Sequence, residues 1–169
     1  MSSVNGSETR KYEPREQRLC SEFVREFFPF NRVKFQVRLG RPRVGAGFSD
    51  IPINENIAAH NRRPAADALI IRDWDQILIE TYIKIDLGKV SQLQIYAKLL
   101  PATPDADWNL QLPLRLMIIG ALEDPTLTQH ARENGIEFRL YRPDWVNAYF
   151  DVLAPRNTRN RPPQHPQGS

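Results

Sequence analysis

The chain has 169 residues, of which 41% are hydrophobic and 25% charged, as in an ordinary folded domain. Its net charge of +3 is a mild basic bias, compatible with a nucleic-acid partner. One cysteine and three histidines exclude an internal disulfide and a zinc cluster. No stretch is long and apolar enough to span a membrane, and the polar first residues contain no signal-peptide core. A reducing, cytoplasmic setting is therefore expected.

The two ends of the chain differ in composition from its middle. Residues 1–12 are small and polar, and residues 154–169 hold four prolines and three arginines. Both compositions are typical of disorder, so the sequence predicts one folded domain over residues 13–153 with a disordered tail at each end. The basic second tail is expected to hold nucleic acid or a protein partner, or simply to aid solubility.

The domain begins with a helix, a strand and a long loop. The helix starts near Pro14 and is ended by Pro29, with apolar residues at helical spacing between them. Residues 33–39 alternate between apolar and polar, which is typical of a half-buried strand. Residues 40–63 contain glycines and prolines that predict a long loop, and loops of this length are usually functional or mobile.

A hairpin follows, made of two apolar runs around a polar turn. Both runs are too apolar to face water, so they are expected inside a sheet. After the hairpin comes a helix ended by Pro101, and then a near-continuous apolar strand. The expected elements from the hairpin onward are strands over 65–71 and 77–85, a helix up to 100, a strand over 114–122, a helix over 124–135, a strand over 136–140 and a short helix or turn over 143–153.

The order of these elements predicts the fold class. A strand, helix, strand unit favours a parallel pair with a right-handed crossover, whereas a hairpin pairs antiparallel. The sum is an α/β domain in which a mixed central sheet has helices on both faces.

Two carboxylates interrupt the apolar hairpin. Asp67 stands at the entrance of the first strand, where an isolated aspartate is more often a turn residue bonded to backbone amides. Glu80 lies in the middle of the second strand among isoleucine and leucine, where a glutamate is rarely structural without a partner. Two carboxylates on a buried hairpin are costly unless a cation lies between them, and a divalent metal is the usual one.

The core of the PD-(D/E)XK nuclease superfamily is an aspartate at the mouth of one strand followed by Glu-x-Lys on the next, and Asp67 and Glu80 of this chain resemble its two carboxylates. Its restriction-endonuclease-like fold has the same order of elements, over roughly residues 13 to 150 here. Gln92 and Tyr96 lie one helical turn apart and resemble the Gln-x-x-x-Tyr motif of the RecB-like branch. The resemblance implies that Asp67 and Glu80 bind Mg²⁺, which polarises the scissile phosphate and activates a water. Gln92 and Tyr96 would be supporting residues, or simply an ordinary helix surface.

The catalytic lysine departs from the family pattern. The resemblance places it two residues after Glu80, where this chain has Tyr82. Lys84 follows two residues later, on the same strand face by alternation, and would be a displaced catalytic lysine. The alternative for Lys84 is a solvated charge at the edge, and Lys89 would then be the next cation to test.

Other charged residues are weaker candidates. The resemblance allows Glu16 or Glu22 on the first helix to add a carboxylate, although an exposed helix charge is favoured for both. Five arginines in and beside the long loop are expected to line a phosphate-binding channel, with an ordinary solvated loop as an equal alternative. These arginines are Arg38, Arg41, Arg43, Arg62 and Arg63.

Two functions remain open from the sequence. The first is a PD-(D/E)XK-fold protein acting on DNA, either a small Mg²⁺-dependent phosphodiesterase or a degraded relative of one. The second is a non-catalytic protein that kept the nuclease fold as a scaffold, for DNA binding or for a structural role in an assembly, including a viral one. The second function would place the protein in a virion and would involve protein partners bound through the two tails.

Overall fold

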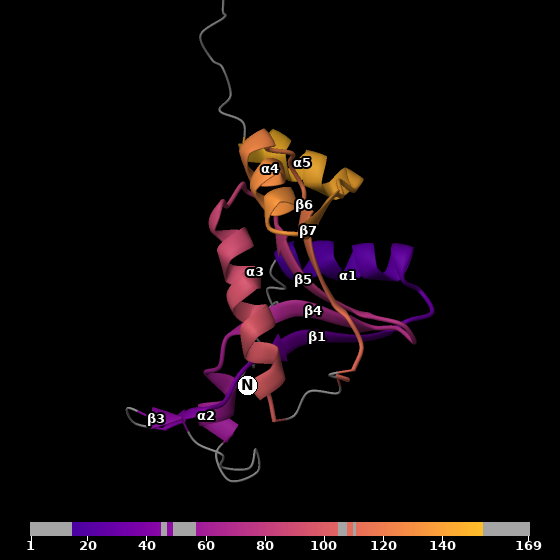
Figure 1. Ribbon diagram of the computed structural model, residues 1–169. Coiled ribbons are helices and arrows are strands. Elements are labelled where there is room, and N and C mark those ends of the chain that lie inside the picture. The colour runs from indigo at the N-terminus through magenta and orange to yellow at the C-terminus, as the bar shows by residue number, and fades with distance from the viewer. Residues whose placement is uncertain (1–14, 45–46, 49–56, 105–107, 110, 154–169) are drawn as a thin grey trace, which may run out of the picture.

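The structure is a computed structural model that describes residues 15–44, 47–48, 57–104, 108–109 and 111–153 (Figure 1). The two predicted tails, 1–12 and 154–169, lie outside the described residues. The elements are α1 (Arg15–Phe27), β1 (Arg32–Arg38), β2 (Arg43–Val44), β3 (Gly47–Phe48), α2 (Ile57–Asn61), β4 (Ala65–Ile71), β5 (Gln76–Tyr82), α3 (Gly88–Leu99), a 3-10 turn (Leu100–Ala102), β6 (Leu114–Gly120), α4 (Pro125–Glu133), β7 (Ile136–Leu140) and α5 (Asp144–Leu153).

One five-stranded sheet carries the fold, in the order β1-β4-β5-β6-β7. The first three strands pair antiparallel, whereas β5, β6 and β7 pair parallel. A parallel pair needs a crossover, and α3 and α4 supply the two crossovers of this sheet. The predicted mixed α/β sheet is confirmed, and the hairpin strands β4 and β5 occupy inner positions.

Helices cover both faces of the sheet, as the resemblance to the PD-(D/E)XK superfamily implies. One core cluster joins α1 and α5 to the sheet, and a second joins α3 and α4 to the opposite face. All seven residues of β5 are buried because both of its faces are covered. This double burial explains why β5 reads as a continuous apolar run, and why its single acidic side chain is notable.

The ends of α4 follow the signals in the sequence. Asp124 caps the helix because its carboxylate accepts a hydrogen bond from the backbone N–H of Leu127 at 2.8 Å. Pro125 occupies the first turn, where its missing N–H costs nothing. Gly135 follows the helix with a φ of +68°, a conformation that glycine adopts without strain.

Two expectations about local structure were wrong. The stretch 40–63 is not only loop, because it contains the antiparallel pair β2–β3 and the short helix α2. The strand expected over 77–85 ends at Tyr82, which is also the last residue of β5 paired with β6. Without a neighbouring strand the chain leaves the sheet, and Lys84 is exposed. No helix in the described part of the chain is long and apolar enough to cross a membrane.

Candidate active site

Asp67 lies where β4 and β5 separate. The backbone pairing of β4 with β5 ends at the pair Ala68 and Ile79, so Asp67 is the first residue of β4 beyond it. There the Asp67 carboxylate takes the place of backbone pairing. Its Oδ2 accepts hydrogen bonds from the backbone N–H of Thr81 at 2.8 Å and from the Thr81 hydroxyl at 2.5 Å. The side-chain amide of Gln36 donates to Oδ1 at 3.4 Å. Asp67 is therefore held firmly at the fork of the two strands.

Glu80 is enclosed on the neighbouring strand, with only 1% of its surface exposed. Nζ of Lys89 donates to its Oε2 at 3.0 Å, whereas Oε1 is buried and has no hydrogen-bond partner among the described residues. Burial raises the pKa of Glu80 to about 7, the negative charge of Asp67 adds to that rise, and Lys89 opposes it. The carboxyl of Glu80 thus exchanges its proton near neutral pH.

Lys89 comes from the first turn of α3 and is itself buried. Burial lowers the pKa of Lys89, but the charges of Glu80, Glu16 and Asp67 together raise it more. The net shift is upward, so the ammonium stays charged at neutral pH. Lys89 is therefore a buried cation held among the charges of three carboxylates.

Glu16 is the third carboxylate of this group. Its pKa is raised by burial, lowered by the charge of Lys89 and raised by that of Asp67, so it belongs to the same electrostatic cluster. Its backbone carbonyl lies 3.2 Å from the Thr81 hydroxyl, which ties the start of α1 to β5. The favoured expectation of an exposed helix charge was wrong for Glu16.

Glu22, the other acidic candidate on α1, has a different role. It accepts hydrogen bonds from the Trp145 ring nitrogen at 2.6 Å and from Nε of Arg18 at 2.8 Å. These bonds join α1 to α5, so Glu22 is a structural contact between two helices.

Tyr82, which occupies the motif lysine's position, and Lys84, the expected displaced lysine, make no hydrogen bond to this cluster in the described part of the chain. Tyr82 is fully buried, its hydroxyl donates to the carbonyl of Leu122 at 2.7 Å, and its ring stacks on Phe138. Burial raises the pKa of Tyr82 to about 12. Lys84 lies beyond the end of β5 and is exposed. The expected alternation of Glu80, Tyr82 and Lys84 on one strand therefore fails at Lys84, because the strand stops first.

Gln92 and Tyr96 lie on the same helix as Lys89. The side-chain amide of Gln92 donates to the Tyr96 hydroxyl at 2.7 Å, so the two residues are partners of each other. Positions 89, 92 and 96 follow helical spacing, which puts these side chains on one stripe of α3. Their supporting role stays a prediction.

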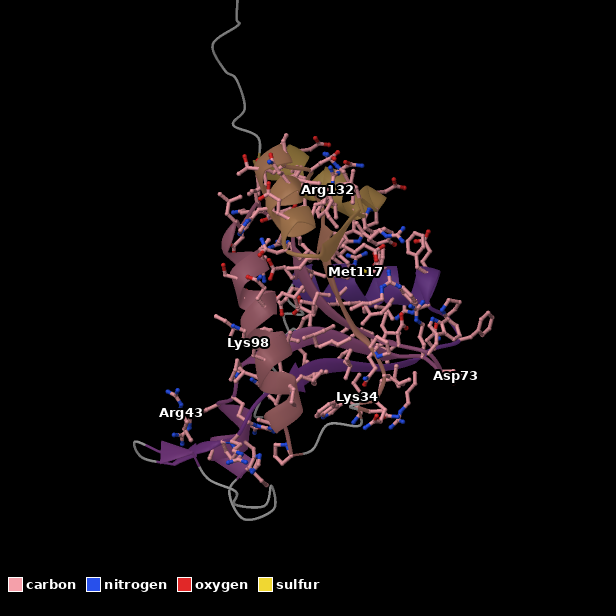
Figure 2. The ribbon with its side chains drawn as sticks, in the orientation of Figure 1. Lys34, Arg43, Asp73, Lys98, Met117 and Arg132 are labelled. Carbon is pink, nitrogen blue, oxygen red and sulfur yellow. The ribbon has the colours of Figure 1, made fainter. Side chains whose placement is uncertain are left out.

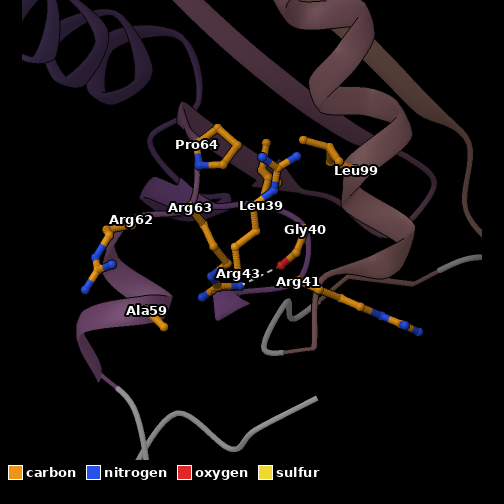
Figure 3. A pocket seen from close by; sticks show the side chains of 9 residues that line it. All are labelled: Leu39, Gly40, Arg41, Arg43, Ala59, Arg62, Arg63, Pro64 and Leu99. Atoms are coloured by element: carbon orange, nitrogen blue, oxygen red, sulfur yellow. Dashed lines mark hydrogen bonds between the residues drawn. The ribbon is translucent and has the colours of Figure 1, made fainter. Parts of the chain in front are cut away.

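The five arginines divide into two groups. Arg63 is only 4% exposed and donates to the carbonyls of His60 and Gly40, both at 3.0 Å, and Arg38 donates to the carbonyl of Arg63 at 2.9 Å. These two arginines tie the chain just after β1 to the chain just before β4. Arg41, Arg43 and Arg62 are exposed and, with Arg63, line a pocket of about 520 Å³ (Figure 3).

The donor set of the cluster suits magnesium better than a transition metal. Among the described residues there is no group of three or more histidine, cysteine, aspartate and glutamate side chains arranged around a metal position. Mg²⁺ needs fewer protein ligands, since it is usually bound through one or two carboxylates together with waters and substrate phosphates. The partnerless Oε1 of Glu80, close to the charge of Asp67, fits such a site.

Sequence reasoning found the two hairpin carboxylates and missed two members of the cluster. Lys89 was only a fallback, although a lysine one helical turn past the strand can reach back to it. Glu16 was expected to be an exposed helix charge, because a single carboxylate on a helix does not by itself indicate burial. Its position three residues before the apolar Leu19 places it at the inner edge of the helix, and this spacing could have indicated that it is partly buried.

No protein-family model matches the chain, and no curated protein sequence matches it either. Similar solved structures include a repair endonuclease from Pyrococcus abyssi, at 17% identity and a TM-score of 0.45 over 75% of this chain and 47% of the other. They also include EndoMS in complex with double-stranded DNA, at 15% identity and a TM-score of 0.42 over 76% and 45% of the two chains.

A third similar structure is a protein from Vibrio cholerae, at 15% identity and a TM-score of 0.45 over 81% of this chain and 30% of the other. The chain thus spans less than half the length of each of these proteins. The likeness at these scores is a partial one in the course of the backbone, and the proposals below rest on the chain's own residues.

Proposed function

We propose that this protein is a metal-dependent phosphodiesterase that cleaves DNA, built on the PD-(D/E)XK plan. One observation carries the proposal: the buried carboxylate of Glu80 has one oxygen bonded to Lys89 and the other without a partner, beside a second carboxylate, Asp67. A structural ion pair normally satisfies both carboxylate oxygens. In this proposal Mg²⁺ would bind through the Glu80 oxygen that has no partner among the described residues.

Each residue of the cluster has a role in this proposal. Asp67 and Glu80 would hold Mg²⁺, which supplies Lewis-acid polarisation of the phosphate and a more acidic bound water. Lys89 offsets the negative charge that grows on the phosphorane oxygens. With a pKa near 7, Glu80 sheds its proton when a cation arrives. The charge of Glu16 helps to keep Lys89 protonated.

A nuclease assay tests this proposal. Purified protein is incubated with single-stranded and double-stranded DNA in Mg²⁺, Mn²⁺ or EDTA. We expect cleavage that depends on the metal and is lost in Asp67→Ala. Asp73→Ala is the matched control, since Asp73 is an exposed aspartate in the turn between the same two strands. Cleavage that persists in Asp67→Ala would show that another site, or a contaminant, is responsible.

A second candidate function is a non-catalytic scaffold that binds DNA or joins a larger assembly, in the cytoplasm or in a virion. Two observations favour it: Lys89 already neutralises Glu80, and the carboxylate is almost wholly enclosed. Wild-type protein that binds DNA but cleaves neither strand form in either metal would support the scaffold and end the nuclease proposal.

A further inference from the structure

The arginine pocket lies apart from the carboxylate cluster. It has a volume of about 520 Å³, which is within the usual range for small-molecule sites. Its walls come from the end of β1, the end of α2, the entry to β4 and the last turn of α3. The lining residues are Leu39, Gly40, Arg41, Arg43, Ala59, Arg62, Arg63, Pro64 and Leu99. In Figure 3, Arg62 and Arg41 lie on opposite sides of the view with Arg63 between them.

The lining combines two kinds of surface. Its described lining contains four arginines and no acidic residue, and this part of the pocket favours an anion. The planar guanidinium group suits phosphate oxygens because it donates parallel hydrogen bonds. The remaining lining is mainly apolar, and its solvent-accessible members Pro64 and Leu99 suit the face of a base or a sugar. A nucleotide unit presents both chemistries in one ligand.

The interior of the pocket is built rigidly. Arg63 is buried and its guanidinium donates to the carbonyl of Gly40, shown as the dashed line in Figure 3. The backbone N–H of Gly40 in turn donates to the hydroxyl of Thr103 at 2.8 Å. Gly40 has a φ of +75°, and an added Cβ would lie 3.3 Å from the Leu99 side chain. Glycine is therefore needed where the chain passes α3 at the pocket wall.

Two elements connect the pocket to the carboxylate cluster. Pro64 comes three residues before Asp67 in nearly extended chain, which spans roughly 10 Å. Leu99 comes ten residues after Lys89 on the same helix, which spans about 15 Å. In Figure 1, α3 runs from the end of β5 toward α2 and β3. The pocket is thus one to a few nucleotides along a strand from the proposed scissile phosphate.

We propose that this pocket binds one nucleotide of the DNA strand next to the cleavage position, with its phosphate at Arg41, Arg43 and Arg62. The base or sugar packs against Pro64 and Leu99. The assignment rests on the proposed function, because it takes DNA as the substrate. It adds a subsite that holds the strand in place while the carboxylate cluster acts.

Binding is tested without cleavage. Fluorescently labelled single-stranded DNA is titrated with protein carrying Asp67→Ala, in EDTA, and anisotropy is followed over a series of salt concentrations. Into this protein we introduce Arg41→Ala, Arg43→Ala and Arg62→Ala together. These side chains are exposed, and a melting curve checks that the triple variant is folded before its affinity is compared. The control is Arg132→Ala on α4, which lies at the other end of the molecule from Arg43 (Figure 2).

We expect the triple variant to bind at least about tenfold more weakly, with a salt dependence reduced by up to about 2 in log–log slope, from roughly 0.7 per lost phosphate contact. Arg132→Ala should bind as the parent does. Free deoxynucleotide monophosphate should displace the strand at lower concentration than inorganic phosphate.

Three results would overturn the inference: unchanged affinity in the triple variant, an equal loss in Arg132→Ala, or equal competition by phosphate and nucleotide. The proposed function fails separately. If wild-type protein binds strands through the arginines but never cleaves them, the pocket stands and the nuclease does not. If the triple variant binds and cleaves normally while Asp67→Ala is inactive, the nuclease stands and the pocket does not.

Discussion

Two buried carboxylates, one just before β5 and one toward its other end, differ in how many of their oxygens accept hydrogen bonds from cations. Asp75, just before the strand, accepts from both Nε and Nη2 of Arg72, and Nη1 of Arg115 lies 3.4 Å away. The bonds from Arg72 lower the pKa of Asp75, although burial opposes them. Glu80 has a lysine on one oxygen only, and burial raises its pKa to about 7.

The difference lies in how fully the oxygens of each carboxylate are satisfied. Asp75 is 5% exposed and Glu80 is 1% exposed, so burial alone does not separate them. The number of donors does: both oxygens of Asp75 accept hydrogen bonds, whereas one oxygen of Glu80 has no partner among the described residues, and the charge of Asp67 is nearby. A satisfied pair fixes a turn, and an unsatisfied one leaves a site for a cation.

The largest expected effect is on cleavage. Lys89→Ala removes the cation at Glu80 and should slow DNA cleavage by a factor of about 10²–10³, the usual loss for one electrostatic stabiliser. Lys84→Ala removes an exposed lysine five residues earlier and should stay within about twofold of wild type. Single-turnover cleavage rates in Mg²⁺ measure both. Equal losses, or a loss only in Lys84→Ala, would return the catalytic role to Lys84.

The next effect is on stability at the other end of the strand. Arg72→Ala leaves Asp75 buried with only the longer contact to Arg115, and should lower the free energy of unfolding by about 3 kcal/mol. The matched control is Arg139→Ala, which breaks an exposed ion pair with Glu137 and should cost about 0.5 kcal/mol or less. Urea unfolding curves give both values. A small loss in Arg72→Ala would mean that Asp75 is no structural anchor.

The pH dependence of stability should have opposite signs for the two carboxylates. The pKa of Glu80 is raised from 4.5 to about 7, so its folded form binds the proton more tightly than its unfolded form. Its contribution to stability is full below about pH 4.5 and is lost as the pH rises toward 7. The lowered pKa of Asp75 acts the other way, with stability that is lost as the pH falls below its ordinary value of 3.8.

Glu80→Gln isolates the first of these effects. Glutamine keeps the shape but does not titrate, so the variant should be on the order of 1 to 3 kcal/mol more stable than wild type at pH 8, and close to it at pH 4. Thermal unfolding at several pH values measures the difference. Parallel pH profiles in the variant and wild type would show that Glu80 titrates normally.

The smallest effect concerns Tyr82. Tyr82→Phe removes the hydrogen bond to the carbonyl of Leu122 and should cost about 1 kcal/mol of stability, with cleavage unchanged. The same urea and cleavage assays measure it. A large loss of cleavage at unchanged stability would place the phenol in the site after all.

The fold followed from local patterns in the sequence. Three local patterns predicted elements that the structure contains. They are the alternation in 33–39, the apolar hairpin and the Asp124-Pro125 start of α4. Agreement among such signals is what lets one sequence select one fold. Asp67 and Glu80 were found because a charge in an apolar run conflicts with burial, and that conflict is visible in one dimension.

Only the tertiary structure decided which cation and which third carboxylate lie near Asp67 and Glu80. Lys89 and Glu16 come from two different helices that pack on the sheet, and nothing local in the sequence reports where a helix docks. The length of β5 was likewise set by its partner, since pairing with β6 stops at Tyr82 and Gly120. An added Cβ at Gly120 would lie 2.5 Å from the Tyr82 ring, so that glycine and that tyrosine fit each other across two strands. Such contacts form between segments 38 residues apart, and they depend on distances in space that the order of residues does not contain.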